Sequence, residues 1–292
     1  MSNNTKAIFI LLFAAVISGA TTTVTKFVLL KIPPFSFSFL RFFIASIVIL
    51  PFFLKTKIKM DRNFVSLIAL STLPILNVAF YVIGQKSTTA SIGQLLYSAT
   101  PILVAIFSFV ILRKNISAKK WFFVFLGLIG VLFVIVLPLV ERKSLHAGNL
   151  AGNFLISVGV VFWSLYNTLS KQYLKYFSPI SITAIFIFLS AFVFFFLSIP
   201  EFMQNHSWIS SLQPSSIYAI LYLAVGTTLT AYVLNQYAIK FGGPLLASLS
   251  FYLLPIFAYI SAFILLGEKL TAGLIVGTII VILSIALTTY TK

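Results

Sequence analysis

Long apolar runs fill most of this 292-residue chain and constrain its fold more than any other feature. A helix needs about 20 mostly apolar residues to cross the hydrocarbon core of a lipid bilayer. Continuous runs of this length indicate membrane-spanning helices, whereas a membrane β-barrel would show shorter segments of alternating polarity. The sequence therefore predicts an all-α polytopic membrane protein with ten transmembrane helices, at 7–30, 34–54, 64–84, 92–112, 120–139, 151–173, 179–199, 216–239, 244–266 and 270–290.

The composition excludes an ordinary soluble protein. Hydrophobic residues make up 60% of the chain and charged residues only 8%, whereas about 25% of the residues of a soluble domain are charged. The segments between the apolar runs are too short to form a separate soluble domain. We therefore expect a single transmembrane domain over residues 1–292, surrounded by the lipid bilayer.

The excess of basic residues, with a formal charge of +16, predicts the orientation in the membrane. Most Lys and Arg residues lie in the gaps between apolar runs, which is typical of membrane topology and not of a nucleic-acid-binding surface. When the N-terminus is placed inside, the cytoplasmic gaps hold the larger share, including Lys55, Lys59 and Arg113. The positive-inside rule then predicts that both termini lie in the cytoplasm. We expect an inner or plasma membrane protein with no nucleic-acid partner.

Residues that support catalysis or cofactor binding are scarce. The chain has no cysteine, and its two histidines, His146 and His206, lie in predicted connecting segments, so we predict no metal site and no cofactor. The four acidic residues lie at predicted membrane edges or in loops. We therefore expect no catalytic acid–base pair and no enzymatic activity. The expected transport mode is facilitated diffusion or exchange, with coupling through groups that the sequence does not identify as the alternative.

The second half of the chain resembles the first half. At an offset of 154 residues, Pro101 in the fourth span aligns with Pro255 in the ninth. Each half contains five predicted spans, and an odd number makes the second half enter the membrane from the opposite side. The sequence thus predicts two inverted five-helix repeats, at about 7–139 and 151–290. Inverted repeats are typical of secondary transporters, whose substrate site lies near the membrane midplane.

Short motifs in equivalent places carry a family resemblance. The first span contains SGATTTVTK, which ends at Lys26, and the sixth contains WSLYNTLSK, which ends at Lys171. The ninth span ends in LLGEKLT, which includes Glu268, and the second span contains Arg41. Together these motifs resemble the EamA-like branch of the drug/metabolite transporter superfamily over nearly the whole chain. The resemblance implies a ten-helix carrier of small organic metabolites and leaves the substrate open.

Polar and aromatic side chains within the spans are candidates for a substrate cavity. The resemblance implies that helices of the pairs first and sixth, third and eighth, and fourth and ninth line this cavity. Spacings of three or four residues put neighbouring candidates on one helix face, although interhelical hydrogen bonding is the alternative role for about half of them. The predicted substrate-binding residues are Lys26, Asn77, Tyr81, Gln94, Tyr97, Trp163, Tyr166, Asn167, Asn235 and Tyr252.

Four further residues are predicted to gate the pathway or to set its electrostatics. A charge in hydrocarbon is costly unless it is paired, snorkels or faces water. We expect Lys26 and Arg41 toward the outer leaflet, where they attract a substrate anion or, alternatively, snorkel and cap carbonyl groups. Glu268 is placed to pair with either of them. Pro101 and Pro255 predict paired helix bends, which are either gating elements or static kinks.

Two glycines spaced by three residues, Gly273 and Gly277, form a GxxxG motif in the tenth predicted helix. Such motifs let helix backbones approach each other closely. The motif predicts close packing within the fold, with a homodimer through the tenth helix as the alternative.

These features predict a secondary transporter that works by alternating access. Export of an amino acid or a related amphipathic compound is the preferred interpretation. Uptake or exchange of an anionic or nucleoside-like metabolite is the alternative, because some basic residues lack an obvious partner. A membrane-embedded lipid-modifying enzyme would need acidic or histidine groups clustered at one interface, and a channel would need a continuous open pore.

Overall fold

The structure is a computed structural model that describes residues 2–56, 58–141, 149–210, 212–266 and 272–291. These residues form helices and connecting segments, and no strand occurs among them. The helices are α1 (Asn3–Ser18), α2 (Thr21–Leu29), α3 (Pro34–Leu54), α4 (Arg62–Ser87), α5 (Ala90–Tyr97), α6 (Thr100–Val110), α7 (Ala118–Glu141), α8 (Leu150–Tyr173), α9 (Pro179–Gln204), α10 (Ser207–Ser210), α11 (Pro214–Leu221), η1 (Tyr222–Thr230), α12 (Ala231–Ser248), α13 (Ser250–Leu266) and α14 (Ala272–Tyr290).

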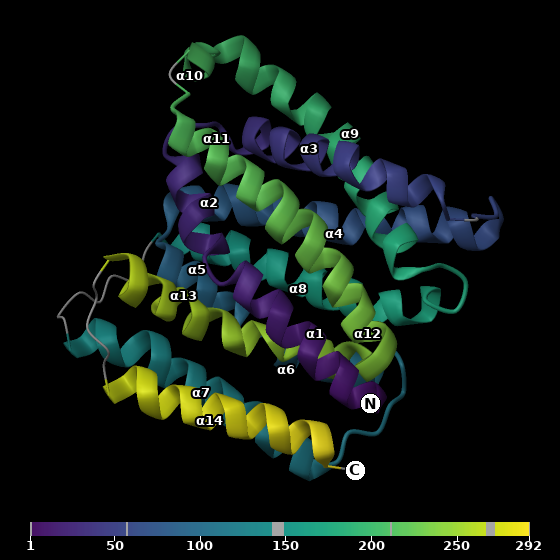
Figure 1. Cartoon of the computed structure of the whole chain (residues 1–292), viewed down its shortest axis with the longest axis vertical. Coiled ribbons are helices and arrows are strands. Elements are labelled where there is room, and N and C mark those ends of the chain that lie inside the picture. Colours follow the sequence, from purple (N-terminus) through teal and green to yellow (C-terminus); the bar gives the residue numbers. More distant parts are fainter. Residues whose placement is uncertain (1, 57, 142–148, 211, 267–271, 292) are drawn as a thin grey trace.

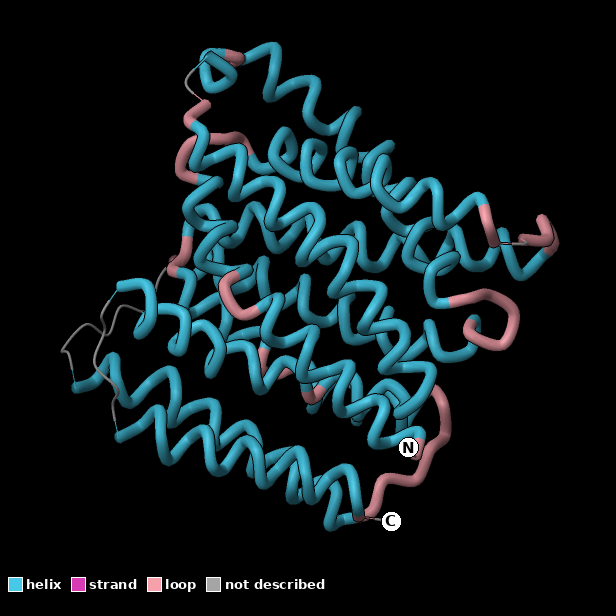
Figure 2. The backbone as a smooth tube through the Cα atoms, in the orientation of Figure 1, coloured by secondary structure: helices cyan, strands magenta, loops and turns pink. Residues whose placement is uncertain are grey.

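Within the described chain, eight helical stretches are long and apolar enough to cross a membrane by length and composition. Two shorter apolar helices, Ser250–Ile260 and Ile275–Tyr290, follow at the ninth and tenth predicted positions. Figure 2 shows the helices packed side by side, with most connecting segments at the two ends of the bundle. The prediction of an all-α polytopic membrane protein is confirmed.

Local sequence signals explain where several helices begin. Asn149 accepts a hydrogen bond from the backbone N–H of Gly152 at 3.0 Å, and Ser178 accepts one from Ser181 at 3.1 Å. Prolines stand in the first turn of α3 and α9, where the missing N–H costs nothing because it would have no helical partner. These caps and prolines reduce the number of N–H groups that a helix start leaves without a partner.

Two of the four acidic residues also serve helix starts. Both carboxylate oxygens of Glu201, on α9, accept backbone N–H groups from the first turn of α3, at 3.1 Å from Phe35 and 2.7 Å from Ser36. Asp61 accepts the N–H groups of Asn63 and Phe64 at the start of α4. These N–H bonds hold the pKa of the exposed Asp61 carboxyl below its usual value. Negative charge at these positions complements the helix dipole.

Four helix pairs build the bundle: α7 with α14, α4 with α8, α3 with α9, and α1 with α12. Within the α3–α9 pair, the fully buried ring of Phe42 lies 5.5 Å from that of Phe186 and 5.7 Å from that of Phe194. The two termini lie at the same end of the bundle (Figure 1). The chain thus alternates between the two bundle ends from one span to the next.

Breaks between helices interrupt several of the predicted spans. The first breaks at Gly19 between α1 and α2, and the fourth breaks between α5 and α6. Pro101 stands in the first turn of α6, so it begins a helix there, whereas α13 runs continuously through Pro255. The two aligned prolines therefore occupy different positions within their helices, and a gating role for them stays a prediction.

The eighth span departs from regular α-helix at two places. The stretch η1 is a π-helix, in which the wider turn lets the hydroxyl of Thr228 donate to the carbonyl of Leu223 five residues before it. Further on, Gly243 has a φ of 85°, a conformation that glycine adopts readily and other residues avoid. This glycine separates the eighth span from the residues that lead into α13.

The GxxxG motif lies inside the fold. Gly273 and Gly277 face α7, where a Cβ atom added at Gly277 would lie 2.6 Å from the carbonyl oxygen of Gly130. Close packing within the chain therefore uses this face of α14. The homodimer through α14 stays a prediction.

We expect Gly277→Leu to destabilise the protein by about 1–3 kcal/mol, because the larger side chain overpacks the α7–α14 contact. The melting temperature of the detergent-purified variant, compared with that of the unmodified protein, measures this loss of stability. Ile279→Leu is the matched control, since Ile279 is 54% exposed on the same helix. Equal melting temperatures for the two variants would contradict the close approach of the two helices.

Candidate substrate cavity

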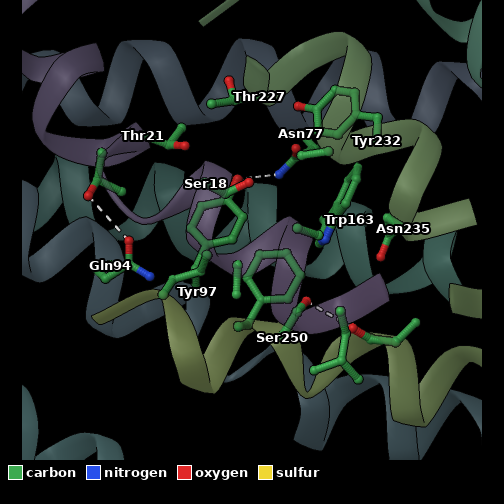
Figure 3. A pocket seen from close by; sticks show the side chains of 18 of the residues that line it. Ser18, Thr21, Asn77, Gln94, Tyr97, Trp163, Thr227, Tyr232, Asn235 and Ser250 are labelled. Atoms are coloured by element: carbon green, nitrogen blue, oxygen red, sulfur yellow. Dashed lines mark hydrogen bonds between the residues drawn. The ribbon is translucent and has the colours of Figure 1, made fainter. Parts of the chain in front are cut away.

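A cavity of about 120 Å³ lies inside the bundle, between α1, α2, α3, α4, α5, α8 and the region from η1 to α13. Polar and aromatic side chains converge on it from these separate helices (Figure 3). Its volume has room for several water molecules. Its polar and aromatic lining residues are Ser18, Thr21, Thr22, Arg41, Asn77, Tyr81, Gln94, Tyr97, Trp163, Thr227, Tyr232, Asn235, Ser250 and Phe251.

Many of the predicted site residues meet here. The structure brings six of the ten predicted binding residues to the cavity wall: Asn77, Tyr81, Gln94, Tyr97, Trp163 and Asn235. Arg41, which the sequence analysis placed toward the outer leaflet as a gating residue, also lines the cavity.

Asn77 ties three helices together at the cavity wall. Its side-chain amide donates to the hydroxyl oxygen of Tyr97 at 2.5 Å and to the carbonyl oxygen of Gly159 at 2.8 Å. A Cβ atom added at Gly159 would lie 3.1 Å from the backbone of Asn77, so α4 and α8 approach closely at this point. The hydrogen bonds orient the Tyr97 ring in the cavity.

Aromatic rings form one continuous wall. The ring of Tyr97 stacks on Phe251 at 5.8 Å and meets Tyr81 edge-on at 5.4 Å. Trp163 lies 5.3 Å from Tyr232 and 6.2 Å from Phe251, measured between ring centroids. Such a wall offers stacking and edge contacts to a flat or apolar ligand.

Two buried N–H donors on the wall have no hydrogen-bond partner within the described chain. They are the indole N–H of Trp163 and the side-chain amide nitrogen of Gln94. Each side chain is only 4% exposed. Leaving a buried donor unpaired costs about 1–3 kcal/mol, so both groups are available to a bound ligand or to water.

Arg41 places a buried cation beside these rings. Its side chain is 3% exposed, and its guanidinium donates to the hydroxyls of Thr227 at 3.3 Å and of Thr228. The Tyr232 hydroxyl lies 3.5 Å away, and the Tyr232 ring centroid 6.0 Å away. Hydroxyl groups solvate a cation without neutralising it. The positive charge of Arg41 is therefore available to an anionic group in the cavity.

Tyr166 and Asn167 lie behind the cavity wall. Tyr166 accepts a hydrogen bond from Gln236 at 2.9 Å, and Asn167 accepts one from Asn235 at 2.7 Å. Both bonds join α8 to α12. These two predicted binding residues therefore hold cavity-lining elements in place without lining the cavity.

Three other predicted residues lie elsewhere. Tyr252 is fully buried and donates to the carbonyl of Val124 on α7 at 2.8 Å. Lys26 lies at the end of α2, away from the cavity lining. Glu268 lies outside the described residues.

Two lysines join helices at opposite ends of the bundle. The ammonium of Lys26 donates to the carbonyls of Gln85 and Lys86 at the end of α4, at 3.1 and 2.7 Å. The ammonium of Lys171 donates to the carbonyls of Ile239 and Lys240 on α12, at 3.0 and 2.9 Å. Each lysine thus satisfies carbonyl groups near the end of a neighbouring helix.

The sequence analysis missed several cavity residues. Tyr232 precedes Asn235 by three residues, so the helical spacing already placed the two side chains on one face. Phe251 is one of 32 phenylalanines, and no pattern distinguished it from those that face lipid. Thr227 lines the cavity from η1, where the π-helical turn shifts the usual spacing.

A comparison with protein families places the chain. The profile of the EamA-like transporter family matches residues 5–136 and 150–290. The chain belongs to this family. The predicted family resemblance is confirmed, and the apolar helices and the family together show an integral, multi-pass membrane transporter of small molecules.

Individual relatives support the same conclusion. The uncharacterized transporter YyaM of Bacillus subtilis (strain 168) is 29% identical over 285 residues, which cover 95% of this EamA-like chain and 92% of the relative. The S-adenosylmethionine uptake transporter of Rickettsia prowazekii (strain Madrid E) is 27% identical over 220 residues, 74% of this chain and 69% of that protein. A crystal structure at 17% identity shares the fold, with a TM-score of 0.75 over 97% of this chain and 96% of the other.

We expect Lys26→Met to open the end of the bundle where α2 meets α4. The substitution removes two hydrogen bonds from a charged group, each worth about 1.5–3 kcal/mol. Because the chain has no cysteine, a single Ser18→Cys change in the cavity reports access. Labelling by a membrane-impermeant maleimide should be faster in the Lys26→Met background.

Lys31→Met is the control for this experiment, since the exposed Lys31 ammonium donates to the side chain of Gln213 at 2.9 Å and lies over the Phe27 ring. Exposed polar pairs of this kind contribute little to stability. Equal labelling rates in the Lys26→Met and Lys31→Met backgrounds would show that the Lys26 contacts do not restrict access.

Proposed function

We propose that this EamA-like transporter carries a small organic metabolite that combines a carboxylate with an apolar or aromatic part. An amino acid or a related amphipathic compound fits this description. The single observation that carries the proposal is the buried guanidinium of Arg41, bonded to hydroxyl groups, on the wall of an aromatic-lined cavity. Export from the cytoplasm is the proposed direction.

The charge argument favours a ligand with one anionic group. A buried cation is costly in a membrane interior unless something compensates it. A substrate carboxylate could form two parallel hydrogen bonds to the planar guanidinium, with better geometry than isolated hydroxyl groups provide. Binding would thereby stabilise a charge that the protein keeps in place before the substrate arrives.

The remaining lining favours a ligand with a flat or apolar portion. The rings of Tyr97, Trp163 and Tyr232 offer stacking surface, and the free donors of Trp163 and Gln94 offer hydrogen bonds. A substrate that reaches both regions would satisfy the cation and the donors together. Such convergence of a few polar groups on an apolar pocket is typical of small-molecule sites.

The transport mode that we propose is alternating access between two inverted repeats, by facilitated diffusion or exchange. The helix pairing supports this arrangement, because exchanging the two halves converts the α1–α12 pair into the α8–α4 pair. Among the described acids, Asp61 and Glu201 are bound at helix starts. The cavity lining includes no described carboxylate or histidine that would carry a proton.

A second candidate function is uptake or exchange of an anionic or nucleoside-like metabolite. The relative named as an S-adenosylmethionine uptake transporter favours it. S-adenosylmethionine combines a carboxylate with a flat adenine ring. The guanidinium of Arg41 suits the carboxylate, and the aromatic wall suits the ring. The proposed orientation, with both termini in the cytoplasm of an inner or plasma membrane, is common to both candidates.

We expect L-phenylalanine to raise the melting temperature of the detergent-purified protein, and phenethylamine, which lacks the carboxylate, to have no such effect. A ligand that binds only the folded state stabilises it by mass action. Arg41→Gln should weaken binding about tenfold or more, because a hydrogen bond to a charged group is worth about 1.5–3 kcal/mol. Trp163→Ala should weaken the binding of aromatic compounds most.

Tyr252→Phe is the control, since Tyr252 is a buried tyrosine away from the cavity. Stabilisation by adenosine compounds in place of amino acids would favour the second candidate. Equal losses in Arg41→Gln and Tyr252→Phe, or stabilisation by the amine alone, would overturn the carboxylate site.

We expect no proton coupling in reconstituted vesicles. Labelled substrate inside the vesicles should leave faster when unlabelled substrate is present outside, and an imposed pH gradient should not drive its accumulation. The physical reason is that the described cavity lining carries no group that titrates near neutral pH. Accumulation driven by a pH gradient would contradict the proposed mode.

A further inference from the structure

A second cavity, of about 750 Å³, lies at the end of the bundle where α6 and α8 end. We call it the basic cavity, because its lining includes the five basic residues Arg113, Lys114, Lys171, Lys175 and Lys240. No acidic residue is among the described residues that line it. It shares no lining residue with the central cavity.

The positive-inside rule accounts for basic residues at this end of the bundle but not for their arrangement around one hollow. The five cations come from three separate places: the segment after α6, the end of α8 with the segment after it, and α12. Lys114 and Lys171 both line this hollow, and like charges that share a cavity repel each other. Converging cations of this kind are stabilised by a ligand with more than one negative charge.

Neutral polar side chains complete the wall. Asn63, Ser66, Gln172 and Tyr176 also line the basic cavity, although the Asn63 amide donates to Asp61 at 3.1 Å and the Ser66 hydroxyl to the carbonyl of Arg62 at 3.0 Å. Lys171 uses its ammonium for the two carbonyls on α12, and since an ammonium has three N–H donors, one remains. Asp61, two residues before Asn63, accepts hydrogen bonds at the start of α4 and is not part of the lining.

The backbone conformation at Arg113 is a further unusual feature of the basic cavity. Its φ is 51°, in the left-handed region, which costs a residue with a Cβ atom roughly 1–2 kcal/mol. Glycine is the usual residue at such a position after a helix. Arginine occupies this position instead of glycine. A ligand-binding role for its charge at the rim of the basic cavity would account for the energetic cost of the backbone conformation.

We propose that the basic cavity binds a phosphate-bearing anion. Basic pockets at the ends of membrane helices suit phosphate groups, because ammonium and guanidinium groups donate several short, charge-assisted hydrogen bonds to them. The phosphate belongs either to the headgroup of an anionic phospholipid or to a soluble phosphate compound. The site is independent of the substrate proposed for the central cavity.

The test uses the full chain, purified in detergent and stripped of lipid, with two probes. Sodium pyrophosphate represents the soluble source, and phosphatidylglycerol, compared with phosphatidylcholine, represents the lipid source. Melting temperature is measured as each probe is titrated. We expect at least one probe to raise the melting temperature of the unmodified protein in a saturable way.

The cavity variant is Lys114→Gln combined with Lys175→Gln. Its matched control is Lys119→Gln combined with Lys120→Gln, which removes the same charge from α7 at the same end of the bundle but outside the cavity lining. We expect the cavity variant to bind the effective probe about tenfold more weakly or worse, since it loses two charge-assisted contacts. The control should bind as the unmodified protein does.

Arg113→Gly provides a variant that does not endanger folding. Because glycine relaxes the backbone at this position, the melting temperature without ligand should stay equal or rise, while binding of the probe weakens. This opposite movement of stability and binding separates a ligand site from a merely structural role.

The outcomes are distinct. Saturable binding of pyrophosphate assigns the site to a soluble phosphate compound, and binding of phosphatidylglycerol without pyrophosphate binding assigns it to a lipid headgroup. If neither probe raises the melting temperature, or if the Lys119→Gln/Lys120→Gln control loses as much binding as the cavity variant, the proposal is overturned.

Discussion

Hydrocarbon offers no hydrogen-bond partners to a polypeptide, and the rest of this structure depends on that constraint. Each span must satisfy its own backbone, which only a helix can do without a closed sheet. Charges must leave the interior or find partners. Glu201 accordingly binds the backbone at the start of α3, and Lys26 and Lys171 bind carbonyl groups at opposite bundle ends. Close helix contacts, such as Gly277 on Gly130, supply the packing.

Three departures from regular helix gather around the central cavity. The break at Gly19, the break between α5 and α6, and the π-helix η1 all contribute or adjoin residues that line it. Irregular backbone at membrane depth is tolerated where it borders a polar cavity rather than lipid. The same region holds Arg41, a cation that lipid would not accept. The irregular backbone and the buried polar side chains therefore lie at the same place, and this makes the cavity the candidate site of substrate transport.

Helical spacing predicted part of the site well. Asn77 and Tyr81 on α4, and Gln94 and Tyr97 on α5, share helix faces by sequence alone, and all four reach the cavity. Spacing could not predict which face of α8 turns toward the cavity. In the structure Trp163 lines the cavity, whereas Tyr166 and Asn167 lie behind its wall and bond to α12. The cavity position of Arg41 was equally hidden, because its hydroxyl partners lie nearly two hundred residues further along the chain, on η1.

The sequence by itself determined that the chain is a helical membrane protein, how many spans it has, and which transporter family it resembles. The fold class and the spans follow from the length of the apolar runs, which the thickness of the bilayer sets. The family resemblance follows from short motifs. Both are local properties of the sequence. Only the tertiary structure decided which polar side chains meet. The convergence of Arg41 with the aromatic wall, and of five cations around the basic cavity, comes from helices distant in sequence. Such meetings depend on how helices rotate and pair, and a periodic apolar pattern leaves those rotations open.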